Sequence, residues 1–495
     1  MYKRNRINPR VLGIIGGIVL FLGFLALFAM GNSEKVVQEL YRSAEDLYNQ
    51  ADYEGAIVKY TEALDASMKE GVNTQMIDKD FTTLANYKIA VSYSRLAKQS
   101  GDWDHYKTAI GYIEKVALTA FVPKHQEALT YLWGHTLYKT QQFKQAELKF
   151  KQLIENFPES LFVENAWYAI GQVNYKLGDY EDSRQAFKSI LEGFPTSDFK
   201  DDAQHLIAQS FLNELNYEQA YQEFDKLETE EFKNYPNLQA EAMYKAAYSL
   251  NQLGRDEEAI QRYTNFIKLF PESPYVTAAY FDQGEVYARQ KNYQSARINY
   301  ESALQATADR TLQAEIKSAI GRTYFDQRDH KNAIVLYNVL LEKYPDSDFV
   351  AEAKLGIADS HFRLEDWNKA IEAYKHLISE HAEAIDFVPY SSYQVGEAYY
   401  KLGTEQKNAD RMIQATTSLE LALQWYQKTV DNYPQDPIAL HALYGAVMTL
   451  DSLGRKEELE NVAREFINKA QDNSGFDSLI TEVQLILEDL LRDKK

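Results

Sequence analysis

The stretch ENAWYAIGQVNYKLGDYEDSRQAFKSILEGFP, residues 164–195, decides the fold of this chain. In its first half, four side chains recur at i, i+3, i+4 and i+7, the spacing of one helix face: Trp167, Ile170, Gly171 and Asn174. Gly178 and Asp179 then provide a helix C-cap and a turn. In the second half, Ser183, Phe187 and Ile190 line another face, until Pro195 ends the helix. The stretch therefore predicts two amphipathic helices joined by a tight turn.

This helix pair repeats along most of the chain. A small residue marks the second helix of each pair, with a spacing of 37 residues from Ala109 to Ala220 and from Ala259 to Ala370. An aromatic residue usually follows four positions later, as Phe187 follows Ser183. The first helix also carries a recurring small residue: Gly134, Gly171, Ala208, Ala247, Gly284, Gly321, Ala358 and Gly396. Because helices approach closely only where side chains are small, we predict that the helices of each pair cross at these residues.

These residues resemble the tetratricopeptide repeat, which has small residues at positions 8 and 20 and aromatic residues at positions 4, 11, 17 and 24. The resemblance covers nearly everything after residue 36. It implies an all-α fold, a right-handed α-α superhelix of about eleven helix hairpins over residues 37–470, with a capping helix over 475–495. The longer period is similar to that of bacterial envelope repeat proteins: the Tol-Pal-associated coordinator, the outer-membrane barrel-assembly lipoprotein and the Sec translocon ancillary subunit. No single one of them is a close match.

The first 30 residues differ in composition from the rest. Residues 11–30 carry no charge and would span about 30 Å as a helix, the thickness of a bilayer core. Basic residues in the tail 1–10 precede them, which predicts a transmembrane signal-anchor helix with a cytoplasmic N-terminus. A cleaved signal peptide is the alternative. Gly13 and Gly17 form a small-xxx-small pair that would suit a homodimer of spans.

The composition also bounds the chemistry. The chain has no cysteine and a net charge of −20, which argues against disulfides, a thiolate metal site and nucleic-acid binding. Its nine histidines show no metal-ligand spacing. No nucleotide-binding glycine loop or nucleophile elbow occurs. We therefore expect no enzyme activity, no catalytic residue, no metal and no cofactor.

Two segments interrupt the repeat register, near residues 67–81 and at residues 404–415. Insertions in repeat arrays form loops or lengthened helices on one face, which is often a binding face. We interpret both as tolerated surface insertions.

The resemblance also implies a binding groove lined by the first helices. In this family repeat positions 2, 5, 9, 12 and 13 point inward. Positions 5, 9 and 12 correspond to Tyr131, His135, Tyr138, Tyr168, Gln172, Tyr175, His205, Gln209, Leu212, Tyr244, Tyr248, Asn251, Phe281, Glu285, Ala288, Ser318, Arg322, Phe325, Leu355, Asp359, Phe362, Tyr393, Glu397 and Tyr400. Tyrosine offers a large contact area for little lost entropy, and the set becomes more acidic toward the C-terminus. The alternative for each aromatic residue is packing against the neighbouring hairpin.

Together these features predict a membrane-anchored scaffold or co-chaperone for protein–protein interactions in the cell envelope. We expect a single-pass protein of the cytoplasmic membrane with a periplasmic body, whose partners are peptide segments or helices of other proteins. Two alternatives remain: a cytosol-facing receptor, and a carbohydrate-binding scaffold of a polysaccharide export system. Fold alone does not decide among them.

Overall fold

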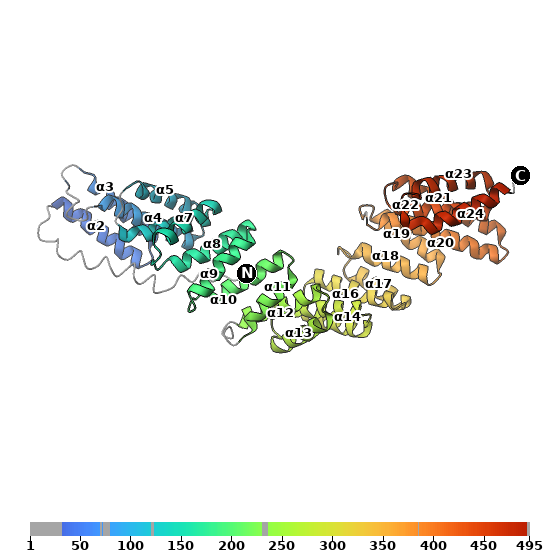
Figure 1. Ribbon diagram of the computed structural model, residues 1–495, viewed down its shortest axis with the longest axis horizontal. Coiled ribbons are helices and arrows are strands. Elements are labelled where there is room, and N and C mark those ends of the chain that lie inside the picture. The colour runs from blue at the N-terminus through green and yellow to red at the C-terminus, as the bar shows by residue number, and fades with distance from the viewer. Residues whose placement is uncertain are drawn as a thin grey trace. The chain divides into compact units, whose positions relative to one another are not determined.

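A computed structural model describes residues 32–69, 72, 80–119, 123–229, 236–384 and 386–492. Helices and connecting turns make up this described part, which contains no strand (Figure 1). The chain divides into two compact units, Met1–Arg255 and Asp256–Lys495. The predicted transmembrane span 11–30, the basic tail 1–10 and the Gly13/Gly17 pair lie outside the described residues. Within the described ranges, no helix combines the length and the hydropathy needed to cross a bilayer.

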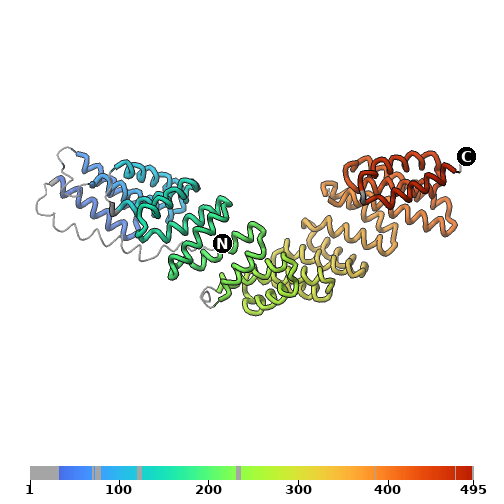
Figure 2. The backbone as a smooth tube through the Cα atoms, in the orientation of Figure 1, coloured from blue at the N-terminus to red at the C-terminus, as the bar shows by residue number. Residues whose placement is uncertain are grey.

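In unit 1, each helix packs mainly against the helices before and after it in the sequence. Figure 2 shows this as a backbone that turns back on itself at short connections. The helices of unit 1 are α2 (Asn32–Asn49), α3 (Tyr53–Ser67), α4 (Phe81–Ser100), α5 (Asp104–Ala117), α6 (Pro123–Lys139), α7 (Phe143–Asn156), α8 (Val163–Leu177), α9 (Tyr180–Gly193), α10 (Lys200–Asn213), α11 (Tyr217–Asp225) and α12 (Pro236–Gln252), with a short 3-10 turn at Lys226–Glu228.

Unit 2 follows the same plan. Its helices are α13 (Asp256–Leu269), α14 (Val276–Arg289), α15 (Tyr293–Ala306), α16 (Arg310–Asp326), α17 (His330–Lys343), α18 (Val350–Arg363), α19 (Trp367–Glu380), α20 (Val388–Asn408), α21 (Met412–Asn432), α22 (Ile438–Leu453), α23 (Lys456–Ala470) and α24 (Asp477–Arg492), with a 3-10 turn at Ser474–Phe476. Helix α24 packs on α23 and buries Val483, Leu487 and Leu490.

The predicted crossing points are where the two helices of a pair meet. A Cβ atom on Gly171 of α8 would lie 2.5 Å from a ring carbon of Phe187 on α9. Gly134, Gly284, Gly321 and Gly396 meet the aromatic ring of their own second helix in the same way. The ring fills the space that a side chain would occupy, so the glycine and the buried aromatic residue form one packing unit. Ser183 also fits this crossing, because its hydroxyl donates to the Gly171 carbonyl at 2.8 Å.

The turns inside the helix pairs place one residue in the left-handed region. Gly178 (φ +81°), Gly254 and Gly454 take this place, as the sequence predicts for a C-cap glycine. Seven other turns put a residue with a side chain there: Ala51, Gln141, Leu215, Lys291, Arg328, Glu365 and Asp410. These positions carry backbone strain that glycine would relieve.

Serines of Pro-x-Ser segments close four of the connections between pairs. Ser197 Oγ accepts from the backbone N–H of Phe199, 3.0 Å away, and Phe199 occupies the N-cap position without a side-chain cap. Ser160, Ser273 and Ser347 make the same bond two residues onward. The serine therefore closes the turn before the helix, because its short side chain reaches only the second residue on.

The second insertion lengthens a helix pair. Helices α20 and α21 each have 21 residues, against 14 in α18 and α19. Met412 and Ile413 lie at the far end of this pair and are 55% and 87% exposed. Most of the first insertion lies outside the described residues.

Candidate functional site

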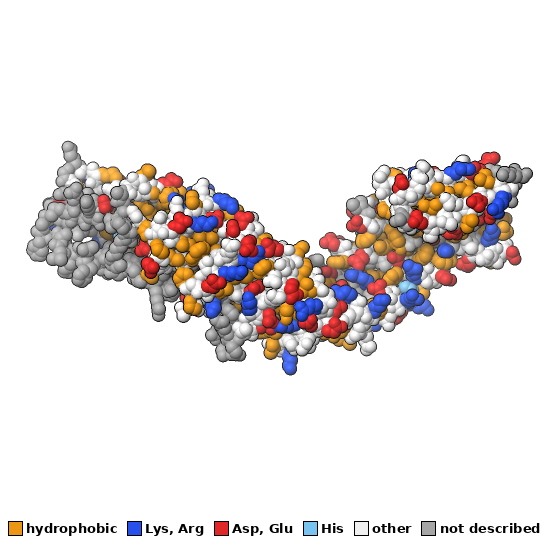
Figure 3. Space-filling model, in the orientation of Figure 1, with side chains coloured by type: hydrophobic (Ala, Val, Ile, Leu, Met, Phe, Trp, Pro, Cys, Tyr) orange, Lys and Arg blue, Asp and Glu red, His pale blue; other side chains and the backbone are white. Residues whose placement is uncertain are grey.

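The predicted groove positions all lie on the first helices of their pairs, but their side chains have different neighbours. Some rings are packed between hairpins in unit 1. Tyr168 stacks on Phe199 of the next hairpin with ring centroids 4.4 Å apart, and Tyr131 stacks on Phe162 at 4.9 Å. Burial raises the pKa of Tyr131 to about 12. These two tyrosines hold neighbouring hairpins together. Hydrophobic side chains are prominent over α7 to α9 in the space-filling view (Figure 3).

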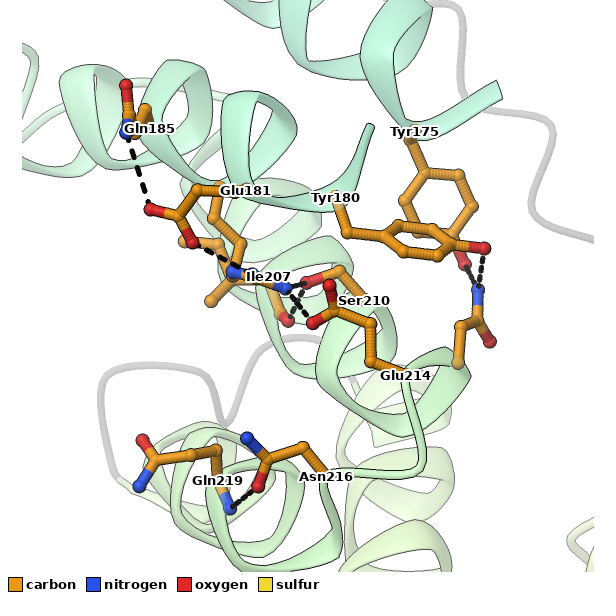
Figure 4. A network of polar contacts seen from close by, with 11 residues as sticks. Tyr175, Tyr180, Glu181, Gln185, Ile207, Ser210, Glu214, Asn216 and Gln219 are labelled. Atoms are coloured by element: carbon orange, nitrogen blue, oxygen red, sulfur yellow. Dashed lines mark hydrogen bonds and ion pairs between the residues drawn. The ribbon is translucent and has the colours of Figure 1, made fainter. Parts of the chain in front are cut away.

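A row of amide and phenol groups is more accessible. Asn213 on α10 donates its amide hydrogen atoms to the hydroxyl groups of Tyr175 at 2.8 Å and Tyr180 at 3.3 Å. Gln209, one turn earlier on α10, donates its side-chain amide to the side-chain oxygen Oδ1 of Asn213 at 2.9 Å. Figure 4 shows Tyr175 and Tyr180 close together on one side of this contact network. Asn213 is exposed and is not among the predicted groove residues, although it directly follows one of them, Leu212.

Beneath this row, a buried arginine joins two hairpins. Arg184 of α9 is 5% exposed. Its guanidinium pairs with Glu181 at 2.8 Å and Glu214 at 2.5 Å, and donates to Ser210 at 3.1 Å (Figure 4). Arg297 in unit 2 repeats the arrangement in part, since it donates to Gln327 at 2.9 Å and lies over the Tyr324 ring. These contacts hold the helices that carry the predicted groove residues in a defined order.

His135 and Gln172 occupy the same repeat position in successive hairpins. Burial, together with the positive charge of Lys139, lowers the pKa of His135 to about 3. The imidazole is therefore neutral near pH 7. Gln172 donates a side-chain hydrogen bond to Tyr168, which ties it to the stacked ring. Tyr138 packs against Phe143 of its own second helix.

An ion-pair cluster between α10 and α12 adjoins the amide row, because Lys245 of α12 donates to the side-chain oxygen of Gln209. Lys245 lies 2.6 Å from Glu241, and His205 lies 3.3 Å from the same carboxylate oxygen. Burial opposes ionisation of Glu241, but His205 and Lys245 outweigh it and lower its pKa to about 2. Tyr248 contacts the Tyr217 ring edge-on, and Tyr244, Leu212 and Asn251 complete the predicted positions of unit 1 at partly or fully buried sites.

Unit 2 shows a different arrangement at the same repeat positions. Glu285 of α14 accepts a hydrogen bond from Tyr300, and Asp359 of α18 accepts one from Tyr374. Glu397 of α20 accepts one from Tyr426 at 2.6 Å. In each case the donor is the buried tyrosine at the helix crossing. Each of these predicted groove carboxylates is therefore held in place by a hydrogen bond from the buried tyrosine of its own helix pair.

The remaining predicted positions of unit 2 are mostly packed. Phe281 contacts Tyr300, Phe325 contacts His330, and Phe362 contacts Trp367. Tyr393 lies between Tyr426 and His441, with centroids 5.9 Å and 6.1 Å away. Tyr400 packs against the core of the last hairpins, while Leu355 and Ala288 are partly buried. Arg322 is half exposed and lies 3.6 Å from Glu352, and Ser318 is fully buried.

The described residues contain no group of three or more histidine and carboxylate side chains placed to hold a metal ion. What the structure provides is two sets of side chains on the first helices: hydrogen-bonding amides and phenols in unit 1, and tyrosine-anchored carboxylates in unit 2.

Three family models match parts of the chain. The model for anaphase-promoting complex, cyclosome, subunit 3 matches residues 102–190. The outer membrane lipoprotein model matches residues 205–359, and a tetratricopeptide repeat model matches residues 352–384. No curated protein matches the sequence significantly.

Solved structures of repeat proteins are similar at low identity. The apo form of RapI has 18% identity and a TM-score of 0.41, covering 72% of this chain and 98% of its own. The Naa15/Naa10 complex bound to HypK-THB has 14% identity and a TM-score of 0.40, covering 92% and 67%. A tetratricopeptide repeat protein from Parabacteroides merdae has 16% identity and a TM-score of 0.34, covering 58% and 99%. The repeat register, its helix crossings and the matching family models identify the chain as a tetratricopeptide-type repeat protein.

Proposed function

We propose that this protein is a membrane-anchored scaffold that binds segments of other proteins in the cell envelope. The observation that carries the proposal is the row of Tyr175, Gln209 and Asn213. Asn213 is exposed and Tyr175 and Gln209 are partly exposed, and the three side chains bond to one another, to Tyr180 and to Lys245. A peptide backbone can exchange with the neutral amide–phenol bonds of the exposed Asn213 at little cost. The buried Arg184 contacts preorganise the helices beneath, which lowers the entropy cost of binding.

The membrane and envelope parts of the proposal rest on the sequence. The uncharged residues 11–30 follow basic residues of the tail, which favours a signal-anchor with the repeats on the outer side of the cytoplasmic membrane. The match of residues 205–359 to an outer membrane lipoprotein family supports an envelope location. A phosphatase reporter fused after Lys495, active only outside the cytoplasm, tests this. A cytoplasmic reporter signal would show that the repeats face the cytosol.

Site-specific photo-crosslinking of the full chain in its own membrane tests protein binding. A photoreactive residue at Asn213 or Gln172 should form adducts with a small set of envelope proteins. Lys188, exposed on the second helix α9, is the matched control and should form few. If Asn213 and Gln172 give no more adducts than Lys188, these positions are not a binding surface and the proposal fails. Adducts spread over many unfolded exported chains would indicate a chaperone rather than a dedicated scaffold.

A further inference from the structure

We propose that the first helices α14, α16 and α18 of unit 2 form a docking surface for a segment of a partner protein that carries lysine or arginine side chains. The inference deepens the proposed function and rests on it, because it names the chemistry of the protein segment that unit 2 binds. It concerns Glu285, Glu315 and Glu352, together with Arg322 and Ser318.

The first step is a charge imbalance across three consecutive hairpins. The charges of three carboxylates act on one guanidinium: Glu285 of α14, Glu315 of α16 and Glu352 of α18 all interact electrostatically with Arg322 of α16. The single ion pair within 4.0 Å that joins these described groups is Arg322 to Glu352 at 3.6 Å. The Arg322 side chain is 48% exposed and that of Glu352 32% exposed. An ion pair this long and this exposed contributes little, so a competing cation can replace it.

The second step is a comparison inside the chain. Glu45 of α2 occupies the same repeat position as Glu285 and likewise accepts from a crossing tyrosine, Tyr60. There the charge is compensated, because Lys88 Nζ of α4 lies 2.7 Å from the Glu45 carboxylate. Among the described residues of unit 2, no lysine or arginine forms an ion pair within 4.0 Å of the Glu285 carboxylate. The repeat thus has a place for a cation beside this carboxylate, and in unit 2 the chain does not fill it.

The electrostatics agree with the geometry. Desolvation, followed by the negative charges of Glu285 and Glu352, raises the pKa of Glu315. Desolvation works to lower the pKa of Arg322, but Glu352 and Glu285 outweigh it and the pKa is raised. Each carboxylate therefore gains from an added positive charge. Asp359 on α18 and Glu397 on the next first helix, α20, continue the acidic positions.

Ser318 gives an independent sign of an unfilled site. It is 0% exposed, and its hydroxyl has no hydrogen-bond partner among the described residues. It lies three residues after Glu315 and four before Arg322, so the three side chains share one face of α16. In other hairpins this position holds a ring, as in Tyr168 and Phe281. A lysine or arginine side chain that displaces Arg322 from Glu352 brings N–H donors to the helix face that carries this unpaired hydroxyl.

The ligand is a flexible organic cation rather than a metal ion. The described residues place no three carboxylate or histidine groups close enough to hold a metal. The acidic positions instead recur once per hairpin along α14, α16 and α18, which suits positive side chains spaced along an extended segment.

Binding of fluorescein-labelled octa-arginine to the purified full chain tests the proposal, with octa-glutamine as the neutral peptide. The double variant Glu315→Gln plus Glu352→Gln should weaken octa-arginine binding roughly ten-fold at low salt. The matched control is Glu301→Gln plus Glu342→Gln, which removes two exposed carboxylates of the second helices α15 and α17. That control should change binding less than two-fold, roughly, because distant surface charges are screened. Equal weakening in both double variants would overturn the proposal.

A second variant predicts a gain. Arg322→Gln removes the internal competitor and should tighten octa-arginine binding several-fold, whereas Lys331→Gln, the same charge change on the exposed surface of α17, should not. No difference between the two would also overturn the proposal. The peptide result separates the two claims: if octa-arginine fails while Asn213 still crosslinks to envelope proteins, this inference is wrong and the scaffold function stands.

Discussion

The hydroxyl of Tyr426 donates a hydrogen bond to Glu397 across a helix pair, at 2.6 Å. The same bond joins Tyr300 to Glu285 and Tyr374 to Asp359. Where the crossing residue is phenylalanine, the partner position holds a neutral side chain instead: His135 with Phe150, Gln172 with Phe187, and Gln209 with Phe224. At these three crossings the carboxylate is the acceptor for a buried hydroxyl. Part of the acidic character of unit 2 is therefore structural.

Removing one of these hydroxyls should destabilise unit 2. Tyr426→Phe leaves the ring in place against Gly396 but removes the 2.6 Å hydrogen bond that Tyr426 donates to Glu397, which then keeps only its hydrogen bond to Tyr393. Because hydrogen bonds to charged groups are the stronger ones, we expect a loss of about 2 kcal/mol in the free energy of unfolding. Urea unfolding followed by circular dichroism measures it.

Tyr337→Phe is the matched control. Tyr337 is also a buried crossing residue, facing Gly321, but its partner position holds Arg322. No hydrogen bond joins its hydroxyl to another described residue, so the substitution should cost less than about 0.5 kcal/mol. Equal losses in the two variants would show that the Tyr426–Glu397 bond contributes nothing beyond ring packing.

The helix pairs and their crossing points could be predicted because their register repeats. One repeat such as Gly171 with Phe187 is ambiguous, but the same spacing at Gly284 and Tyr300 makes chance improbable, and the structure confirms the contact. The expected turn glycine at Gly178 is equally local, since a left-handed residue has few substitutes.

The partners of the groove side chains could not be predicted in the same way. Sequence spacing places Tyr168 on a helix face, but it does not say that Phe199 of the next hairpin covers the ring. The bond between Tyr426 and Glu397 joins two helices, so neither residue alone predicts it. A comparison of the repeats carries part of this signal: Tyr300, Tyr374 and Tyr426 accompany a carboxylate, whereas phenylalanine accompanies glutamine or histidine. Tyr337, which accompanies Arg322, shows that the pairing is not general.

A histidine in unit 1 makes stability depend on pH. The pKa of His135 is about 3 in the folded chain, against about 6.5 when exposed. Because the pKa of His135 is depressed in the folded chain, the neutral imidazole makes its full contribution to stability above pH 6.5. This contribution is lost as pH falls toward 3. We expect a loss of about 1 kcal/mol between pH 7 and pH 5, after a discount for the partial exposure of the ring. Urea unfolding at both pH values measures this loss.

His135→Gln tests the assignment with a side chain that the next two hairpins already use, Gln172 and Gln209. The variant should lose this part of the pH dependence while remaining folded. If the wild type and the variant show the same decrease between pH 7 and pH 5, other groups are responsible for it.

The helix crossing predicts opposite effects of two similar substitutions. Gly171→Ala places a Cβ 2.5 Å from the Phe187 ring, which must move in a packed core, so we expect a loss of about 2 kcal/mol. Gly193→Ala, at the end of α9, meets no atom within 4 Å and should stabilise slightly through helix propensity. Thermal unfolding separates them: Gly171→Ala should lower the midpoint, and an unchanged midpoint would mean that the crossing is looser than the distance indicates.

The strained turns offer the reverse test. Leu215 has φ +58° between α10 and α11, and its side chain is 68% exposed, so little packing is lost on removing it. Leu215→Gly should stabilise unit 1 by about 0.5–1 kcal/mol, because relief of left-handed strain exceeds the added entropy of the unfolded chain. Gly178→Ala, at the equivalent turn with φ +81°, should destabilise by about 1 kcal/mol. Urea midpoints of the two variants should therefore move in opposite directions. A fall in both would mean that Leu215 makes packing contacts worth more than its strain, and that the left-handed conformation is imposed by its neighbours rather than tolerated by them.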